Sequence, residues 1–202
     1  MKRRFMAFRM FAMVTGSPFV LPVLRLEVHG RIDPARKKGP LIVVSNHVGV
    51  LDVVAINFLV FPARISYLGS PRLFGKNPIQ SVFLYAFGTH VLGEGESGQD
   101  AVDFAVSILR EGEMYGIMPE GRIEDTGALL PFKTGAARIA LGSGALVQPL
   151  YFRKRRRLAE RVRVWVGEPI DPKDPAVARL GVRGLTDALY DAIAALKAAA
   201  GD

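Results

Sequence analysis

Short apolar runs rich in β-branched residues alternate with longer segments of helical periodicity along most of the chain. The runs predict strands and the periodic segments predict helices. The predicted strands are Leu24–His29, Leu41–Ser45, Arg64–Leu68, His90–Leu92, Met114–Met118, Leu146–Phe152 and Arg161–Val166. The predicted helices are Val50–Val60, Pro78–Phe87, a segment from Ser97 to Arg110, Thr134–Leu141 and about Leu185–Ala199.

This alternation is typical of the α/β class, in which helices cover a largely parallel sheet. Strands buried on both faces read as continuous apolar runs, and the stretch LIVVS at Leu41–Ser45 is one. We therefore predict a single domain with a largely parallel mixed sheet flanked by helices. Its core spans residues 24–170, and a C-terminal helix within 171–202 packs on that core. Residues 1–23 form a separate N-terminal segment.

The composition limits what kind of protein this is. The chain has 202 residues, of which 50% are hydrophobic, and it carries a formal net charge of +8. Its mean hydropathy is nevertheless positive, at +0.22. A protein that is both apolar and basic suits an anionic membrane surface better than it suits nucleic acid. The absence of cysteine excludes thiol nucleophiles, cysteine-based zinc sites and disulfides.

The positive charge is concentrated in two places, residues 1–9 and residues 153–163. The second contains seven Lys or Arg residues against one Glu. The two patches together carry more positive charge than the net charge of the whole chain, so the rest of the chain is slightly acidic. Such patches bind phosphate-rich surfaces, either nucleic acid or anionic lipid. The alternative for residues 153–157 is a solvated loop between two strands.

Residues 10–24 form a mostly apolar run that follows the basic N-terminus. The run is shorter than the roughly 20 residues that span a bilayer, and Gly16, Pro18 and Pro22 interrupt it. We interpret residues 1–23 as a membrane-associating segment that lies in one leaflet or on the protein surface. The alternative is a core helix of the domain.

A histidine and an aspartate follow the strand Leu41–Ser45. His47 and Asp52 can meet only if His47 lies in the turn after the strand and Asp52 lies in the first turn of the next helix. Such a pair supplies a general base, because the carboxylate fixes the tautomer of the imidazole. The alternative is a surface histidine and an aspartate that favours the helix dipole.

The strand Met114–Met118 is followed by a second polar cluster. Glu120 and Arg122 come next, and an arginine at this edge can bind a phosphate through two hydrogen bonds. Lys133 precedes the next predicted helix, whose N-terminus favours anions. The alternative for Glu120 and Arg122 is a local ion pair.

Other motifs do not match. Residues 69–77 look like a P-loop, but they have one residue too many between the glycines and asparagine where serine or threonine is required. His29, His47 and His90 have no metal-ligand spacing. No metal site is predicted.

The ordered blocks resemble the lysophospholipid (glycerolipid) acyltransferase family, of the 1-acylglycerol-3-phosphate acyltransferase type. They are Asn46-His47-x4-Asp52, Pro119-Glu120-Gly121-Arg122, Phe132-Lys133-Thr134-Gly135-Ala136 and Val147-Gln148-Pro149-Leu150. The similarity runs from about Leu24 to Ile170, and the order and spacing together are more specific than any single block.

The resemblance implies that the chain is an O-acyltransferase of phospholipid biosynthesis. His47 would be the general base and Asp52 would orient it, so both are candidate catalytic residues. Asn46, Glu120, Gly121, Arg122 and Lys133 are the candidate substrate-binding residues. The implied donor is acyl-CoA or acyl-carrier protein, with no bound cofactor and no covalent enzyme intermediate.

Two departures from the family pattern affect the acceptor. Arg122 follows Gly121 directly, a form that resembles the branch that acylates lysophosphatidylethanolamine. The arginine that usually closes the middle block is missing near Gly93, so Arg72, Lys76 or Lys133 would have to replace it. The acceptor is therefore 1-acyl-glycerol-3-phosphate or another lysolipid such as lysophosphatidylethanolamine.

The resemblance also implies partners and a location. We expect a lysophospholipid acceptor, an acyl-CoA or acyl-carrier-protein donor, and an anionic membrane surface, but no nucleic acid. Family members are monotopic membrane enzymes, so the chain is expected at the cytoplasmic face of a membrane as a monotopic or peripheral protein. Two other functions remain open: a non-catalytic binder of anionic membranes or nucleic acid through residues 153–163, and an esterase that uses the same histidine.

Overall fold

The computed structural model describes residues 24–33, 39–71, 78–91, 97–124, 126–155 and 160–202, together with Pro22 and Arg157. The predicted membrane-associating segment 1–23, apart from Pro22, lies outside these residues. Arg72, Lys76 and the segment around Gly93 lie outside them as well.

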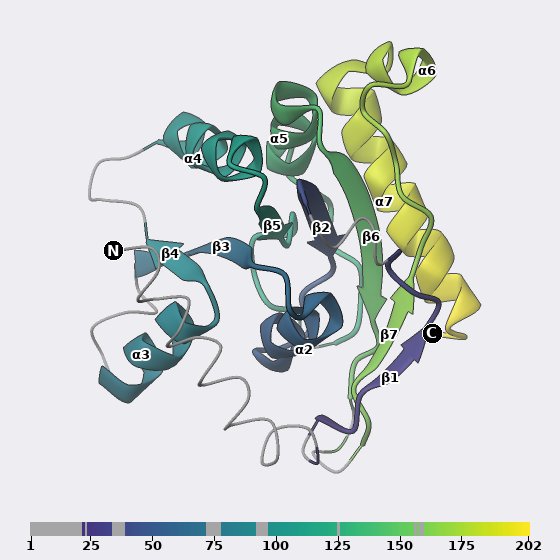
Figure 1. Ribbon diagram of the computed structural model, residues 1–202. Coiled ribbons are helices and arrows are strands. Elements are labelled where there is room, and N and C mark those ends of the chain that lie inside the picture. Colours follow the sequence, from purple (N-terminus) through teal and green to yellow (C-terminus); the bar gives the residue numbers. More distant parts are fainter. Residues whose placement is uncertain are drawn as a thin grey trace.

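A seven-stranded sheet runs through the described part of the chain (Figure 1). In chain order its strands are β1 (Glu27–His29), β2 (Leu41–Ser45), β3 (Ile65–Gly69), β4 (Thr89–Val91), β5 (Met114–Ile117), β6 (Leu146–Phe152) and β7 (Arg163–Val166). Their order across the sheet is β1-β7-β6-β2-β5-β3-β4. Neighbouring strands are parallel except for β6 and β7, which are antiparallel. The predicted mixed, largely parallel sheet is confirmed.

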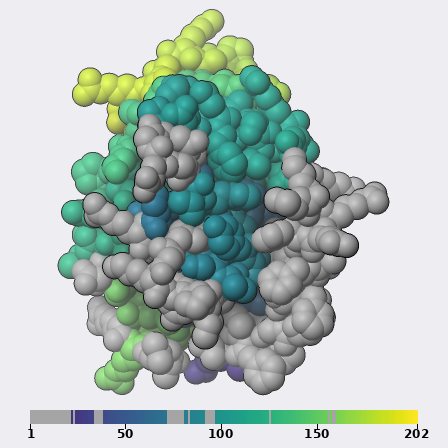
Figure 2. Space-filling view, turned by 90° about the vertical axis from the view of Figure 1, so that its left-hand side faces the viewer, coloured from purple at the N-terminus to yellow at the C-terminus, as the bar shows by residue number. Residues whose placement is uncertain are grey.

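The helices that the described residues form are α2 (Leu51–Val60), α3 (Pro78–Ala86), α4 (Gly98–Arg110), α5 (Gly135–Ser143), α6 (Pro175–Ala178) and α7 (Gly181–Ala199). In Figure 1, α4, α5 and α7 lie along the upper and right-hand side of the sheet, and α2 lies at its lower edge. Figure 2 shows the side of the molecule that α4 covers, with the yellow C-terminal helices above it. None of the helices in the described residues is both long enough and apolar enough to cross a bilayer.

The central strand β2 explains the two layers of helices. Leu41 and Val43 point into a core that includes side chains of α2, whereas Ile42 and Val44 point into a core built from α4, α5 and α7. All four side chains are at most 1% exposed. Because a strand between two apolar layers has no polar face, β2 reads as an unbroken apolar run.

The predicted elements differ from the structure mainly at their ends. The prediction Leu24–His29 is reduced to β1 at Glu27–His29, because Arg25 has a positive φ of 42° that does not continue a strand. The last helix begins at Gly181 rather than near Leu185. The short helix α6 was not predicted, although Asp174 caps it through its side chain and Pro175 begins it. The predicted helix from Ser97 to Arg110 is confirmed as α4, and a capping box of Ser97 and Asp100 begins it.

The strand order brings three chain segments to one edge of the sheet. The strands β6, β2 and β5 are adjacent and parallel, so their carboxyl ends meet at the same edge. In Figure 1 the arrows of β2 and β6 point toward the edge where α2 lies. Ligands of open α/β sheets bind at the carboxyl ends of the strands, so this edge is where chemistry is expected.

The close approach of Gly116 in β5 to Tyr67 can be tested by substitution. A β-carbon on Gly116 would overlap the ring of Tyr67, which is 3% exposed. We expect Gly116→Ala to lower the free energy of unfolding by about 1–3 kcal/mol, as overpacking does in a close-packed core. The measurement is urea unfolding followed by circular dichroism.

Gly98→Ala is the matched control, because a β-carbon at Gly98 would have no neighbour within 4 Å. Alanine also favours helix over glycine, so this control should unfold at the same or a slightly higher urea concentration. An unchanged midpoint for Gly116→Ala would contradict the packing of Tyr67 over Gly116.

Candidate active site

His47 and Asp52 meet at the carboxyl end of β2. His47 lies in the turn after the strand, and Asp52 lies in the first turn of α2. The His47 Nδ1 and the Asp52 Oδ2 are 3.0 Å apart. The same Oδ2 accepts hydrogen bonds from the peptide N–H groups of Val48 at 2.8 Å and Gly49 at 2.9 Å. The structure therefore meets the condition under which the spacing allows the two side chains to make contact.

This arrangement determines the tautomer of the imidazole. An oxygen that already accepts two peptide N–H groups acts as an acceptor toward His47 as well, so Nδ1 carries the proton. In the neutral imidazole, the Nε2 atom is then the one with the free lone pair, and it can take a proton from a hydroxyl group. The side chain of His47 is 19% exposed and that of Asp52 is 4% exposed. The imidazole therefore reaches the surface while the carboxylate that orients it stays buried.

Asn46 joins β2 to β6 beyond the last paired residues of the strands. Its side-chain Nδ2 donates to the Phe152 carbonyl at 2.9 Å, and its Oδ1 accepts from the Phe152 N–H at 2.7 Å. Asn46 is 2% exposed, so both amide atoms are used inside the protein. A substrate-binding role for Asn46 stays a prediction; in the structure its amide positions the residue that precedes His47.

The loop after β5 approaches His47 from the other side of β2. The Glu124 N–H donates to the His47 carbonyl at 2.8 Å, and the Leu130 N–H donates to Glu120 Oε1 at 3.4 Å. Lys197 of α7 donates through its ammonium group to the Gly127 carbonyl. The C-terminal helix thus supports the loop that carries Glu120, so residues far apart in sequence contribute to one site.

The Glu120 carboxylate is in an unusual environment. Glu120 is 5% exposed, and its Oε2 is buried without a hydrogen-bond partner among the described residues. Burial raises the pKa of Glu120 above its ordinary value near 4.5, while the peptide N–H groups of Leu130 and His47 act in the opposite direction. The local ion pair considered for Glu120 and Arg122 is not among the salt bridges of the described residues.

Gly121 allows Lys133 to lie over the loop. Gly121 has a φ of +72°, and its N–H donates to the Met118 carbonyl at 3.1 Å in a tight turn. A β-carbon at this position would come within 3 Å of the Lys133 Nζ and Cε atoms. The peptide N–H of Lys133 also donates to the Pro119 carbonyl at 2.9 Å. The Lys133 ammonium group is therefore held beside Gly121, next to the exposed Arg122.

The basic run after β6 lies at the same edge of the sheet. Together with residues 48–52, Phe152 and Val162 line a cleft of about 520 Å³, and the basic side chains that line it are those of Arg153, Lys154, Arg155 and Arg157. We call these four residues the basic loop. The sequence predicted the charge but not its place beside Asp52, because the order of the strands cannot be read from the pattern of apolar runs.

The described residues contain no group of three or more His, Asp or Glu side chains that could hold a metal ion. The site brings together the imidazole–carboxylate pair, one buried carboxylate and the cations of two loops.

Comparison with known proteins places the chain among acyl-transferring enzymes. A family described as Acyltransferase matches residues 25–153. The 1-acyl-sn-glycerol-3-phosphate acyltransferase of Bacillus subtilis is 28% identical over 165 residues, which cover 77% of this chain and 80% of that protein. The human 1-acyl-sn-glycerol-3-phosphate acyltransferase beta is 30% identical over 134 residues, which cover 64% of this chain and 46% of the human protein.

The fold has a relative among solved structures. The crystal structure of the 1-acyl-sn-glycerophosphate acyltransferase from Thermotoga maritima superposes with a TM-score of 0.66 at 20% sequence identity. The match covers 99% of this chain and 80% of that one. At this identity the likeness shows a shared fold.

The buried Glu120 predicts a dependence of stability on pH. Because its pKa is raised in the folded state, Glu120 stabilises the fold fully below the ordinary glutamate pKa, and this contribution is lost as the pH rises through the raised value. In Glu120→Gln this loss is absent. We expect the stability of the variant relative to the wild type to increase from pH 4 to pH 7, measured by urea unfolding at each pH.

Glu124→Gln is the control of opposite sign. The Thr126 side chain and N–H lower the pKa of Glu124, so its contribution is present at neutral pH and is lost in acid. Its relative stability should therefore fall over the same pH range. Parallel pH profiles for the wild type and Glu120→Gln would contradict the buried position of the Glu120 carboxyl group.

Proposed function

The chain belongs to the Acyltransferase family, and on that premise we propose that it transfers a fatty acyl group from a thioester donor to a hydroxyl group of a lysophospholipid. The observation that carries this proposal is the His47–Asp52 pair, with Nδ1 bound to a buried carboxylate and Nε2 directed away from it. The names of the Bacillus and human relatives favour 1-acyl-glycerol-3-phosphate as the acceptor.

The reaction needs one group that accepts a proton and later returns it. We assign this role to His47 Nε2, which takes the proton of the acceptor hydroxyl while the hydroxyl oxygen attacks the thioester carbonyl carbon. The carbon–sulfur bond then breaks and the imidazolium gives its proton to the departing thiolate. The products are the ester and the free thiol. Asp52 stabilises the imidazolium in between, because its carboxylate is hydrogen-bonded to Nδ1.

The cations beside Gly121 suit the phosphate of the acceptor. The Lys133 ammonium group lies over Gly121, and Arg122 follows it in an exposed position. An arginine and a lysine at one turn can bind a phosphate, the arginine through two parallel hydrogen bonds. We propose that Glu120 receives the glycerol part, since its unpartnered Oε2 can accept a hydrogen bond from a hydroxyl group. Lysophosphatidylethanolamine remains the second candidate acceptor, because its headgroup also contains a phosphate.

A lipid acceptor requires contact with a membrane, and two apolar side chains beside the site support such contact. Val50 is 59% exposed just before α2, and Ile123 is 48% exposed just after Arg122. Exposed apolar residues that flank a site for a lipid are suited to the bilayer interface. We propose that the chain is a monotopic or peripheral protein at the cytoplasmic face of a membrane and acts on acceptors held there.

The assignment of the base predicts the effect of removing it. His47→Ala should lower the rate of acyl transfer to 1-acyl-glycerol-3-phosphate about 10²- to 10⁴-fold, the range that a positioned general base contributes. The assay follows release of free thiol from acyl-CoA in the presence of lysolipid micelles. Thiol release without an acceptor would indicate an esterase instead.

His29→Ala is the matched control, because His29 is exposed, stacks on Trp165 at 4.4 Å and lies outside the site. It should transfer acyl groups at close to the wild-type rate. If His47→Ala retained the wild-type rate, the assignment of His47 as the base would be wrong.

The assignment of the acceptor phosphate predicts a second effect. Arg122→Ala should raise the KM for 1-acyl-glycerol-3-phosphate about 10- to 100-fold, since it removes a hydrogen bond between charged groups. The KM for the acyl donor should not change. With monoacylglycerol, which lacks the phosphate, wild type and variant should have the same low kcat/KM. An equal loss with both acceptors would contradict a contact between Arg122 and the phosphate.

A further inference from the structure

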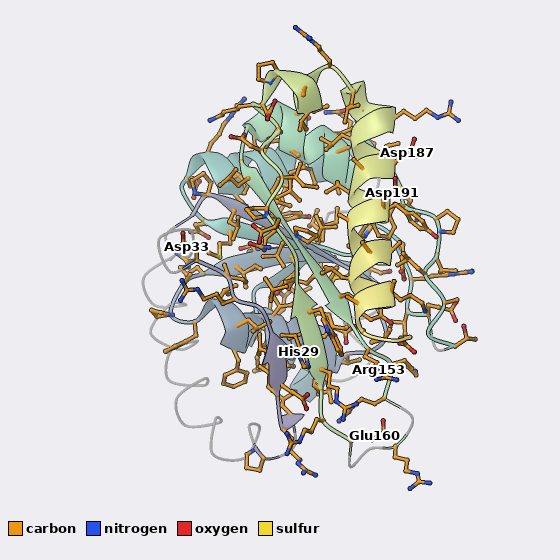
Figure 3. The ribbon with its side chains drawn as sticks, turned by 90° about the vertical axis from the view of Figure 1, so that its right-hand side faces the viewer. His29, Asp33, Arg153, Glu160, Asp187 and Asp191 are labelled. Carbon is orange, nitrogen blue, oxygen red and sulfur yellow. The ribbon has the colours of Figure 1, made fainter. Side chains whose placement is uncertain are left out.

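The cleft beside Asp52 continues away from the catalytic pair. Next to the 520 Å³ cleft lies a second hollow of about 250 Å³, lined by Arg153, Lys154, Arg155, Glu160, Arg161 and Arg163. The two hollows share Arg153, Lys154 and Arg155. The two hollows thus adjoin: Val48, Val50 and Leu51 line the one beside Asp52 together with the basic loop, and charged side chains alone line the further one. In Figure 3, Arg153 and Glu160 lie together at the end of the molecule where β6 and β7 are joined.

Several of the cations along these two hollows have structural partners. Arg161 and Arg163 lie 3.5 Å and 3.4 Å from the carboxylate of Glu27, and so they tie β7 to β1. Arg155 donates to the Glu160 carbonyl at 3.2 Å within the connection between β6 and β7. The positive charge that lines the cleft itself is that of the basic loop, whose four cations line it together with the start of α2.

The basic loop and the cations assigned to the acceptor come from different segments of the chain. Arg122 and Lys133 belong to the loop after β5, and the basic loop follows β6. Because β2 lies between β5 and β6, the two loops follow strands on opposite sides of β2, and the Lys154 side chain lies against Gly127 of the loop after β5. A transfer reaction has two substrates, so the donor and the acceptor each need a binding region near His47. The single phosphate of the acceptor lies close to its reacting hydroxyl, so it suits the compact pair Arg122 and Lys133.

The donor has the opposite geometry. In acyl-CoA and in acyl-carrier protein the thioester is at one end of a long pantetheine arm and the phosphate is at the other. A cleft that has apolar side chains beside Asp52 and leads into a hollow lined only by charged side chains matches that order of groups. Guanidinium groups recognise phosphates through two parallel hydrogen bonds, and such bonds are stronger than neutral ones.

We propose that the basic loop binds the phosphate of the acyl donor, at the end of the pantetheine arm that is far from the thioester. The pantetheine arm then lies along the cleft toward His47. This inference rests on the proposed acyl transfer for its biological meaning, but the binding itself can be measured without catalysis. Under this proposal the basic run after β6 binds the acyl donor. Its charge alone would suggest a lipid surface or nucleic acid instead.

The test uses the full chain and coenzyme A itself as the probe, with binding measured by isothermal titration calorimetry at two salt concentrations. Arg153→Ala with Arg157→Ala should raise the Kd for coenzyme A about tenfold or more and weaken its salt dependence. These positions avoid Arg155, which donates to the Glu160 carbonyl. Arg179→Ala with Arg183→Ala, which removes the same charge from exposed positions around α6 and α7, should bind coenzyme A like the wild type.

Steady-state kinetics identify the source of the phosphate. An equal rise in KM for acyl-CoA and acyl-carrier protein assigns the contact to the phosphate that both donors share. A rise for acyl-CoA alone assigns it to the nucleotide phosphates, and both results support the proposal. A higher KM for the lysolipid with unchanged coenzyme A binding would overturn it in favour of the acceptor. Lost binding to anionic vesicles as the sole effect would overturn it in favour of a membrane contact.

The double variant needs a check on folding, and the outcome must be separable from the proposed function. Arg153→Lys with Arg157→Lys keeps the charge and should recover part of the affinity for coenzyme A, whereas a misfolded loop would not. If the wild type binds coenzyme A but transfers no acyl group to any lysolipid, the proposed function fails and the donor site stands. If the wild type transfers acyl groups and the basic-loop variant keeps both its Kd and its KM, only the donor site fails.

Discussion

The burial of β2 between β5 and β6 is the constraint on which the rest of the structure depends. The strand has apolar contacts on both faces and parallel partners on both edges, so it has no freedom to shift its register without exposing apolar side chains. Whatever follows β2 is therefore delivered to a defined point. The residues that follow β2 are Asn46 and His47. Glu120 lies after the neighbouring strand β5, and the basic loop lies after the neighbouring strand β6.

The site is held mostly by main-chain groups. Asp52 orients His47, and the Val48 and Gly49 N–H groups hold Asp52 in turn. The Glu124 N–H binds the His47 carbonyl, and the Leu130 N–H binds Glu120. Because peptide groups are fixed by the fold, the polar side chains at the site are positioned before any ligand arrives, which is what electrostatic stabilisation of a transition state requires.

Much of this could be predicted from the sequence, and the parts that could not have a common cause. The contact of His47 with Asp52 followed from local geometry, because only a turn followed by a helix start brings those positions together. The strands followed from continuous apolar runs. The place of the basic loop did not, since it depends on β6 lying next to β2, and these strands are far apart in sequence. The burial of Glu120 depends likewise on a loop that Lys197 of the last helix supports.

The bond between Asn46 and Phe152 has a consequence for how such a protein can diverge. Asn46 binds the peptide N–H and carbonyl of Phe152 and does not read its side chain. Any residue except proline can supply those two groups, so the link between the base and β6 places little restriction on the sequence that follows it. Substitutions in the basic loop can accumulate while His47 stays in place. Proteins that descend from a common ancestor can therefore come to prefer different substrates while they catalyse the same reaction.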